Sequence, residues 1–155
     1  MKNYLLKCSV VLAFFASLIG LSSCGDDNVA LVSSKINGPL GEYFEVVDKP
    51  YKVNKTEAKN SISVEIKRTK DGGPTEWWLK SARNRNDYGF TVELMDNDEN
   101  VLVSKTTTYF SDSEQLIAII GLEEGESTSL KIEFESDDDK ENASKAQKVR
   151  VTSHR

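Results

Sequence analysis

Three segments of the chain alternate strictly between apolar and polar residues. Their apolar members are Ile62, Val64, Ile66, Phe90, Val92, Leu94, Leu130, Ile132 and Phe134. Successive side chains of a β-strand point to opposite faces of a sheet, so each segment predicts a strand with one buried and one solvated face. We therefore expect these residues to share one interior.

Shorter apolar stretches predict further strands at residues 43–47, 51–54, 101–107 and 147–152. Turn-forming Asp, Asn, Gly and Pro residues separate them. A run of about seven or eight short strands with such turns predicts an all-β, antiparallel sandwich. The stretch at residues 29–32 is either part of a linker or a first edge strand.

One short helix interrupts the strands. Ser111 and Glu114 have the spacing of a capping box, residues 116–120 are apolar, and Gly121 is a natural stop. We therefore predict a helix of one or two turns that ends at Gly121.

The N-terminus has the pattern of a targeting segment. Lys2 and Lys7 precede a stretch without charge that extends from Cys8 to Gly25. Its apolar part is shorter than the roughly 20 residues that a membrane span needs. We assign residues 1–23 to a secretory signal peptide; the alternative is an uncleaved anchor.

Leu21-Ser22-Ser23-Cys24 resembles the lipobox of bacterial lipoproteins. The resemblance implies that residues 1–23 are removed and that Cys24 carries a diacylglyceryl group on sulfur and a fatty acid such as palmitate on its amine. Two or three acyl chains hold a protein stably on a membrane, whereas one does not. Because Cys8 lies in the removed segment, the mature chain would form no internal disulfide.

Gly25-Asp26-Asp27 follows the lipobox and resembles the export signal of surface lipoproteins of the Bacteroidota type. An aspartate here also resembles the signal that retains other lipoproteins at the inner membrane, and a solvated linker is the third interpretation. Of these interpretations we favour an outer-membrane lipoprotein that is exposed on the outer face of the membrane, at the cell surface. Residues 24–38 are assigned to a lipidated tether and residues 39–155 to the β-sandwich domain.

Charge narrows the choice of partners. Removing residues 1–23 takes away two lysines and no acid, so the net charge falls from −5 to −7. A negative chain is unsuited to nucleic acid or to anionic lipid surfaces, which are bound by clustered Lys and Arg. We therefore expect the membrane to be contacted through Cys24, a glycan or protein as ligand, and no nucleic acid.

The segment from Phe90 to Thr152 resembles the second half of small immunoglobulin-like extracytoplasmic modules. The resemblance rests on a strand that ends in an acidic hairpin, residues 92–98, and on a leucine–glycine turn that leads into a strand, residues 122–127. It implies an immunoglobulin-like sandwich. The hairpin has no glycine, so Asn97 or Asn100 is expected to supply any left-handed position.

The connection from Lys70 to Asp87 is the first candidate site, because long loops often carry function. An aromatic platform beside planar hydrogen-bonding groups suits a glycan or a peptide. Alternatively, the tryptophans fill the end of the sandwich. The candidate ligand-binding residues are Trp77, Trp78, Arg83, Arg85 and Asp87.

The second candidate site is Asp96, Asp98 and Asn100, which alternate like the first ligands of an EF-hand. An EF-hand is excluded because Val101 stands where glycine is required and Thr107 where glutamate is required. A looser calcium site and a solvated turn both stay open. Residues 137–142 contain three adjacent aspartates, which predict a hydrated loop.

Catalytic signatures are missing from the sequence. His154, the only histidine, is penultimate, where chains fray, and Cys24 is the only cysteine after the signal peptide. No zinc cluster or phosphate loop is visible, so we predict no metal and no cofactor. We expect a non-catalytic binding or structural module. The alternative is a small envelope enzyme that acts on glycans through paired carboxylates.

Overall fold

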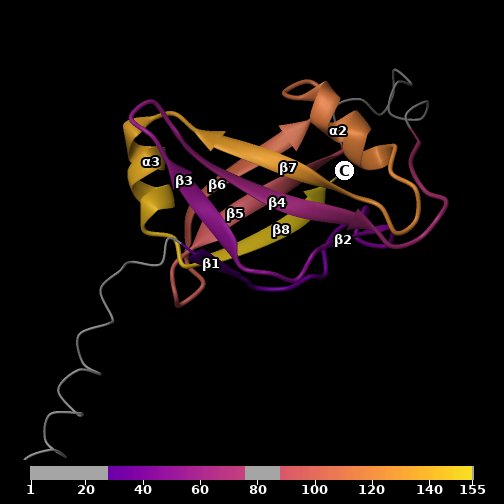
Figure 1. Cartoon of the computed structure of the whole chain (residues 1–155), viewed down its shortest axis with the longest axis horizontal. Helices are drawn as coiled ribbons and strands as arrows, with labels where there is room; N and C mark the ends of the chain where they lie inside the picture. The colour runs from indigo at the N-terminus through magenta and orange to yellow at the C-terminus, as the bar shows by residue number, and fades with distance from the viewer. Residues whose placement is uncertain (1–27, 76–87, 155) are drawn as a thin grey trace, which may run out of the picture.

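A computed structural model describes residues 28–75 and 88–154. In these ranges the chain forms eight strands and two helices (Figure 1). In chain order they are β1 (Asn28–Leu31), β2 (Phe44–Val46), β3 (Tyr51–Lys55), β4 (Asn60–Arg68), β5 (Gly89–Met95), β6 (Val101–Thr108), α2 (Ser113–Ile120), β7 (Ser127–Phe134), α3 (Asp137–Ser144) and β8 (Lys148–His154). No helix in the described ranges is long and apolar enough to cross a bilayer.

The strands form one mixed sheet that folds into two layers. The strand order is β2-β4-β3-β1-β8-β5-β6, and β7 also pairs with β4. One layer holds β2, β3, β4 and β7, and the other holds β5, β6 and β8 (Figure 1). β1 joins the layers, because it pairs antiparallel with β3 and parallel with β8. The sheet is therefore mixed, not purely antiparallel as predicted.

The expected β-rich architecture is confirmed, but the immunoglobulin-like strand order is not. In an immunoglobulin sheet the last strand lies beside the strand that precedes it in the chain. Here β8 pairs with β1 and β5 and not with β7.

The N-terminal boundary of the fold also differs from the prediction. Residues 28–38 were assigned to the tether, yet Asn28–Leu31 is an integral strand and Ile36 is buried in the core. Of the two interpretations of residues 29–32, the strand is therefore correct, although it pairs on both sides and is not an edge strand. The sequence left the choice open because the strand is only four residues long. Such a segment shows too little alternation to predict a strand without knowledge of its neighbours.

The core prediction is confirmed. The nine alternating apolar residues are all buried and belong to one hydrophobic cluster. Phe44 of β2 and Phe90 of β5 connect the two layers, with perpendicular rings 6.1 Å apart. The two layers thus share a single interior, as the alternation of their strands requires.

The predicted helix exists, but it begins one residue later than the capping box implies. Asp112 is the N-cap, and its Oδ1 accepts the N–H of Gln115 at 3.1 Å. The Ser111 hydroxyl instead accepts the N–H of Thr108 at 2.8 Å. Gly121 is the C-cap of the helix, as expected.

Residues 137–142 form most of a second helix, α3, and not the hydrated loop that was predicted. Ser136 caps its first turn by accepting the N–H of Asp139 at 3.2 Å. Acidic side chains in a first turn face the positive end of the helix dipole, which offsets their mutual repulsion. Ala143 is buried and fixes the helix on the domain.

Burial of Phe134 generates the first testable prediction. Phe134→Ala is expected to lower the free energy of unfolding by about 3–5 kcal/mol, because it removes a fully buried ring. Phe110 is the matched control, since its side chain is 65% exposed and Phe110→Ala removes the same atoms from the surface. Urea unfolding measures both variants. Equal losses in the two would contradict this description of the core.

Candidate ligand-binding groove

A groove of about 690 Å³ lies between β6, α2 and β7. Its volume is in the range of about 300–1,000 Å³ found for ligand pockets. Lys105 and Thr107 come from β6, Gln115 from α2, and Ser129 and Glu133 from β7. Most of the lining residues are polar or charged, and no aromatic side chain lines the groove within the described ranges.

One wall of the groove is the free edge of β6, which pairs only with β5 among the described strands. The N–H of Thr108 donates to Ser111 Oγ at 2.8 Å, and its carbonyl accepts the N–H of Asp112 at 2.9 Å. The peptide groups of Thr108 therefore point away from β5. Alternate residues of an antiparallel strand share one direction, so those of Ser104 and Thr106 point away from β5 as well.

The opposite wall is the edge of β7, which a side chain covers. The backbone N–H of Lys131 donates to Gln115 Oε1 at 2.6 Å. The backbone carbonyl of Lys131 accepts a hydrogen bond from Gln115 Nε2 at 3.1 Å. The Gln115 amide thus occupies the place of a neighbouring strand's peptide group. The next outward carbonyl, that of Glu133, accepts Lys105 Nζ at 2.5 Å. Two side chains therefore occupy the edge of β7, as proteins commonly arrange to prevent unwanted strand pairing.

The Glu133 carboxylate lies between two ammonium groups. Its distances are 2.6 Å to Lys131 Nζ and 2.7 Å to Lys59 Nζ. Hydrogen bonds from Lys131 and then Lys59 lower the pKa of Glu133 to about 2. Glu133 is therefore ionised at neutral pH and unsuited to donate a proton.

The other acids show the same tendency. Where the pKa of a described carboxyl group is clearly displaced, it is lowered, in each case chiefly by a hydrogen-bonded partner side chain. These groups are Glu65, Asp96, Glu133, Asp137 and Glu141. A glycosidase of the usual kind needs one carboxyl group that keeps its proton near neutral pH. None of these five residues meets that requirement.

The candidate calcium ligands form a hydrogen-bonded turn. Asp96 Oδ1 accepts the N–H groups of Asp98 and Asn100, both at 2.9 Å, and Oδ2 accepts the Asn100 amide at 2.9 Å. Glu99, with φ of 65°, supplies the left-handed position expected at Asn97 or Asn100. The described residues contain no group of three or more His, Cys, Asp or Glu side chains that could hold a metal ion. The geometry supports the solvated turn.

The loop candidates Trp77, Trp78, Arg83, Arg85 and Asp87 lie outside the described residues, as does Cys24. Their predicted roles stay predictions. His154 is not in a frayed tail: it belongs to β8, pairs with Gly89, and its Nδ1 lies 3.5 Å from Thr91 Oγ1.

Sequence reasoning missed the groove, although one signal was present. Val103, Lys105 and Thr107 occupy the same face of β6, and Val103 and Thr107 are buried. Lys105 lies between them on that face and is exposed, and a charged residue between two buried positions is unusual because charged side chains are rarely buried. It indicates a place where the interior opens to solvent.

No family model, curated protein or solved structure matches this chain. The functional argument therefore rests on the groove and on the N-terminal motif.

The low pKa of Glu133 predicts a specific dependence on acid. Ionised Glu133 contributes its full stabilisation above its usual pKa of 4.5 and loses it as the pH falls towards its folded value of about 2. The free energy of unfolding should fall over this window in the wild type, and less steeply in Glu133→Gln. Glu135→Gln is the control, because Glu135 forms no ion pair among the described residues. Denaturant unfolding at a series of pH values measures the slope of the free energy of unfolding against pH for each protein. Identical slopes in all three proteins would refute the role of the lysine pair.

Proposed function

We propose that this chain is a lipoprotein of the bacterial envelope, anchored in the outer membrane through acylated Cys24 and exposed on the cell surface. Its folded domain acts as a non-catalytic binding module, similar in its sandwich architecture to small immunoglobulin-like extracytoplasmic modules. The observation that carries the binding role is the groove between β6 and β7, where one strand edge is open and the other is covered by side chains.

The position of the groove supports this role. If Cys24 holds the lipid, only residues 25–27 separate it from β1. At about 3.3–3.6 Å per residue, so short a connection keeps that end of the domain close to the membrane. β1 begins at the end of the molecule that carries α3, and α2 lies at the opposite end (Figure 1). The α2 end of the groove would thus face away from the membrane.

The alternative is an envelope enzyme that cleaves glycans through paired carboxylates. It requires a carboxyl group that keeps its proton, whereas each described carboxyl group with a displaced pKa has a lowered one. Of the other two groove acids, Asp112 and Glu114, Asp112 has both carboxylate oxygens engaged by Gln115. These observations favour binding over catalysis.

The anchor is tested by Cys24→Ser. We expect this variant to lose incorporation of a fatty-acid analogue and to leave the membrane fraction, because the acyl chains supply the attachment. Cys8→Ser is the matched control and should keep both properties. Proteinase treatment of intact cells then distinguishes the outer face from the periplasm. Labelling and membrane retention of the Cys24→Ser variant would refute the lipoprotein assignment.

The binding role is tested by retention on glycan and peptide arrays. The wild-type chain should retain a ligand, and Lys105→Glu should weaken that retention because it reverses the charge inside the groove. Lys52→Glu makes the same charge change at an exposed position of β3 and should have no effect. Absence of any retained ligand, or equal effects of the two variants, would contradict a binding site in the groove.

A further inference from the structure

We infer that the ligand of the groove is an extended peptide segment with an acidic side chain, which adds to the free edge of β6 as a further strand. This inference rests on the proposed binding function and specifies its ligand.

The backbone of β6 provides the template. The peptide groups of Ser104 and Thr106 point away from β5 and have no hydrogen-bond partner among the described residues, and Thr106 lines the groove. Both residues are exposed. Unpaired N–H and C=O groups along a strand edge are the groups that bind an added strand in peptide recognition.

The opposite wall determines which edge is used. On β7, the Gln115 amide occupies the N–H and the carbonyl of Lys131, and Lys105 occupies the carbonyl of Glu133. A strand that paired with β7 would have to displace both side chains. A strand that pairs with β6 displaces neither hydrogen bond to Lys131. The added strand therefore pairs with β6 and has Gln115 on its other side.

Charge specifies the side chain. Lys105 points inwards from β6, and its Nζ contacts the uncharged carbonyl of Glu133 at 2.5 Å. Two of the three acids that line the groove have other partners: Glu133 binds two lysines, and Asp112 binds Gln115. The third, Glu114 of α2, forms no ion pair with Lys105 or with any other described residue. A carboxylate on the facing residue of the peptide would give Lys105 a charge-assisted hydrogen bond, which is stronger than a neutral one. Opposite charges across a strand pair also stabilise the pairing.

The same lysine disfavours other occupants. Its charge repels a strand that carries a basic residue at the facing position. If β6 paired with β6 of a second copy in the register that places the two Lys105 residues opposite each other, the two ammonium groups would repel each other. A glycan would lack a stacking platform, because the described lining contains no aromatic side chain.

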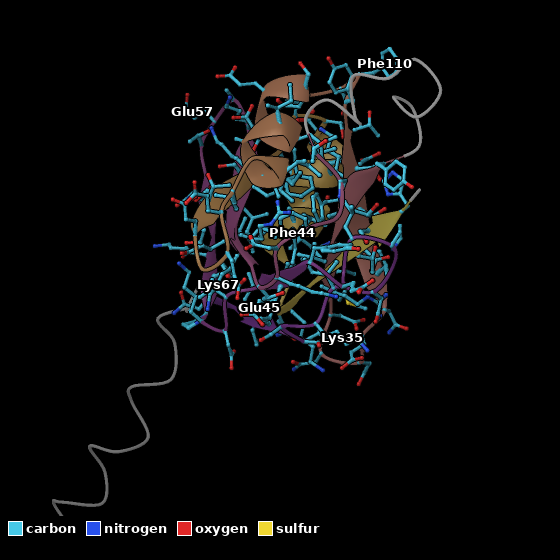
Figure 2. All side chains as sticks on the ribbon, turned by 90° about the vertical axis from the view of Figure 1, so that its right-hand side faces the viewer. Lys35, Phe44, Glu45, Glu57, Lys67 and Phe110 are labelled. Carbon is cyan, nitrogen blue, oxygen red and sulfur yellow. The ribbon has the colours of Figure 1, made fainter. Side chains whose placement is uncertain are left out.

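Apolar contacts are available at the two ends of β6. The exposed large hydrophobic residues among those described are Val101, 46% exposed, and Phe110, 65% exposed. Val101 begins β6, and Phe110 follows its end and projects at the end of the molecule that carries α2 (Figure 2). An extended segment along β6 could contact both with apolar residues that flank the acid.

The experiment selects peptides from a phage-displayed library of random linear sequences, with the full chain held in detergent micelles. The selected peptides should contain an acid between apolar residues, and fluorescence anisotropy measures their affinity. N-methylation of those alternate peptide nitrogens that face β6 should weaken binding by roughly tenfold or more, because each methyl group removes one edge hydrogen bond. N-methylation of the intervening nitrogens should leave the affinity unchanged. This comparison uses the wild-type protein and cannot be confounded by misfolding.

Two variants test the protein side. Thr106→Pro removes an outward N–H and no backbone hydrogen bond to β5, so it should weaken binding roughly tenfold. It also removes the exposed side-chain hydrogen bond to Thr91 Oγ1 at 2.8 Å, so Thr106→Val, which loses only that bond, is the control and should bind like the wild type. Lys105→Glu should lose the acidic peptides and bind the same peptides with the acid replaced by lysine. Lys52→Glu should keep the original preference.

Several outcomes would overturn the inference. They are the absence of an enriched peptide, N-methylation effects without alternation, and an unchanged preference in Lys105→Glu. Self-association that Thr106→Pro abolishes would identify a second copy as the occupant instead. Retention of a glycan that depends on Lys105 would also refute the peptide inference but would leave the proposed binding function intact. If the chain retained neither a peptide nor a glycan, both the inference and the proposed binding function would be refuted.

Discussion

The architecture depends on how four residues of β1 join the two layers. Asn28 and Val29 align with Lys52 and Tyr51 of β3, and the next two residues align with the start of β8. This double pairing closes the sheet on one side of the core. No described strand performs the same task on the other side, where β6 and β7 each keep one unpaired edge. The groove is thus the remaining gap of an incompletely closed sheet.

Helix α2 fills the inner part of that gap and leaves the outer part to polar groups. Leu116, Ile119 and Ile120 are buried and extend the core between the layers. Gln115 lies on the solvent side of the helix, and its side-chain amide hydrogen-bonds the N–H and the carbonyl of Lys131 at the edge of β7, where a neighbouring strand would otherwise do so. A helix can cover apolar side chains in this way, but its own backbone groups are used internally and cannot pair with β6. The edge of β6 therefore remains available to another chain.

The sequence predicts those features that depend on local alternation. Ile62, Phe90 and Phe134 belong to strands with a regular period of two, and their burial follows from that pattern. β1 was not resolved because its role depends on partners far along the chain. α3 was missed because its three aspartates are stabilised by a cap and by the helix dipole, which net charge does not reveal.

The groove shows a similar limit. Lys105 and Glu133 lie 28 residues apart, and only the folded sheet brings them together. Their residue types carry no motif, since a lysine and a glutamate on strands ordinarily indicate solvated faces. The tryptophan loop, in contrast, had a recognisable composition, but a composition does not place side chains. Local patterns therefore predicted the layers, and long-range pairing produced the candidate site.

The parallel pairing of β1 with β8 has a mechanical consequence. If the lipid is attached at Cys24, any pull between the membrane and a bound partner enters the domain through β1. A force along this strand loads its hydrogen bonds to β3 and β8 in shear, so several must break together rather than one after another. The two layers then share the tension. The four residues of β1 would therefore carry the whole load from the anchor, and β8 would transmit it to β5 at the centre of the second layer.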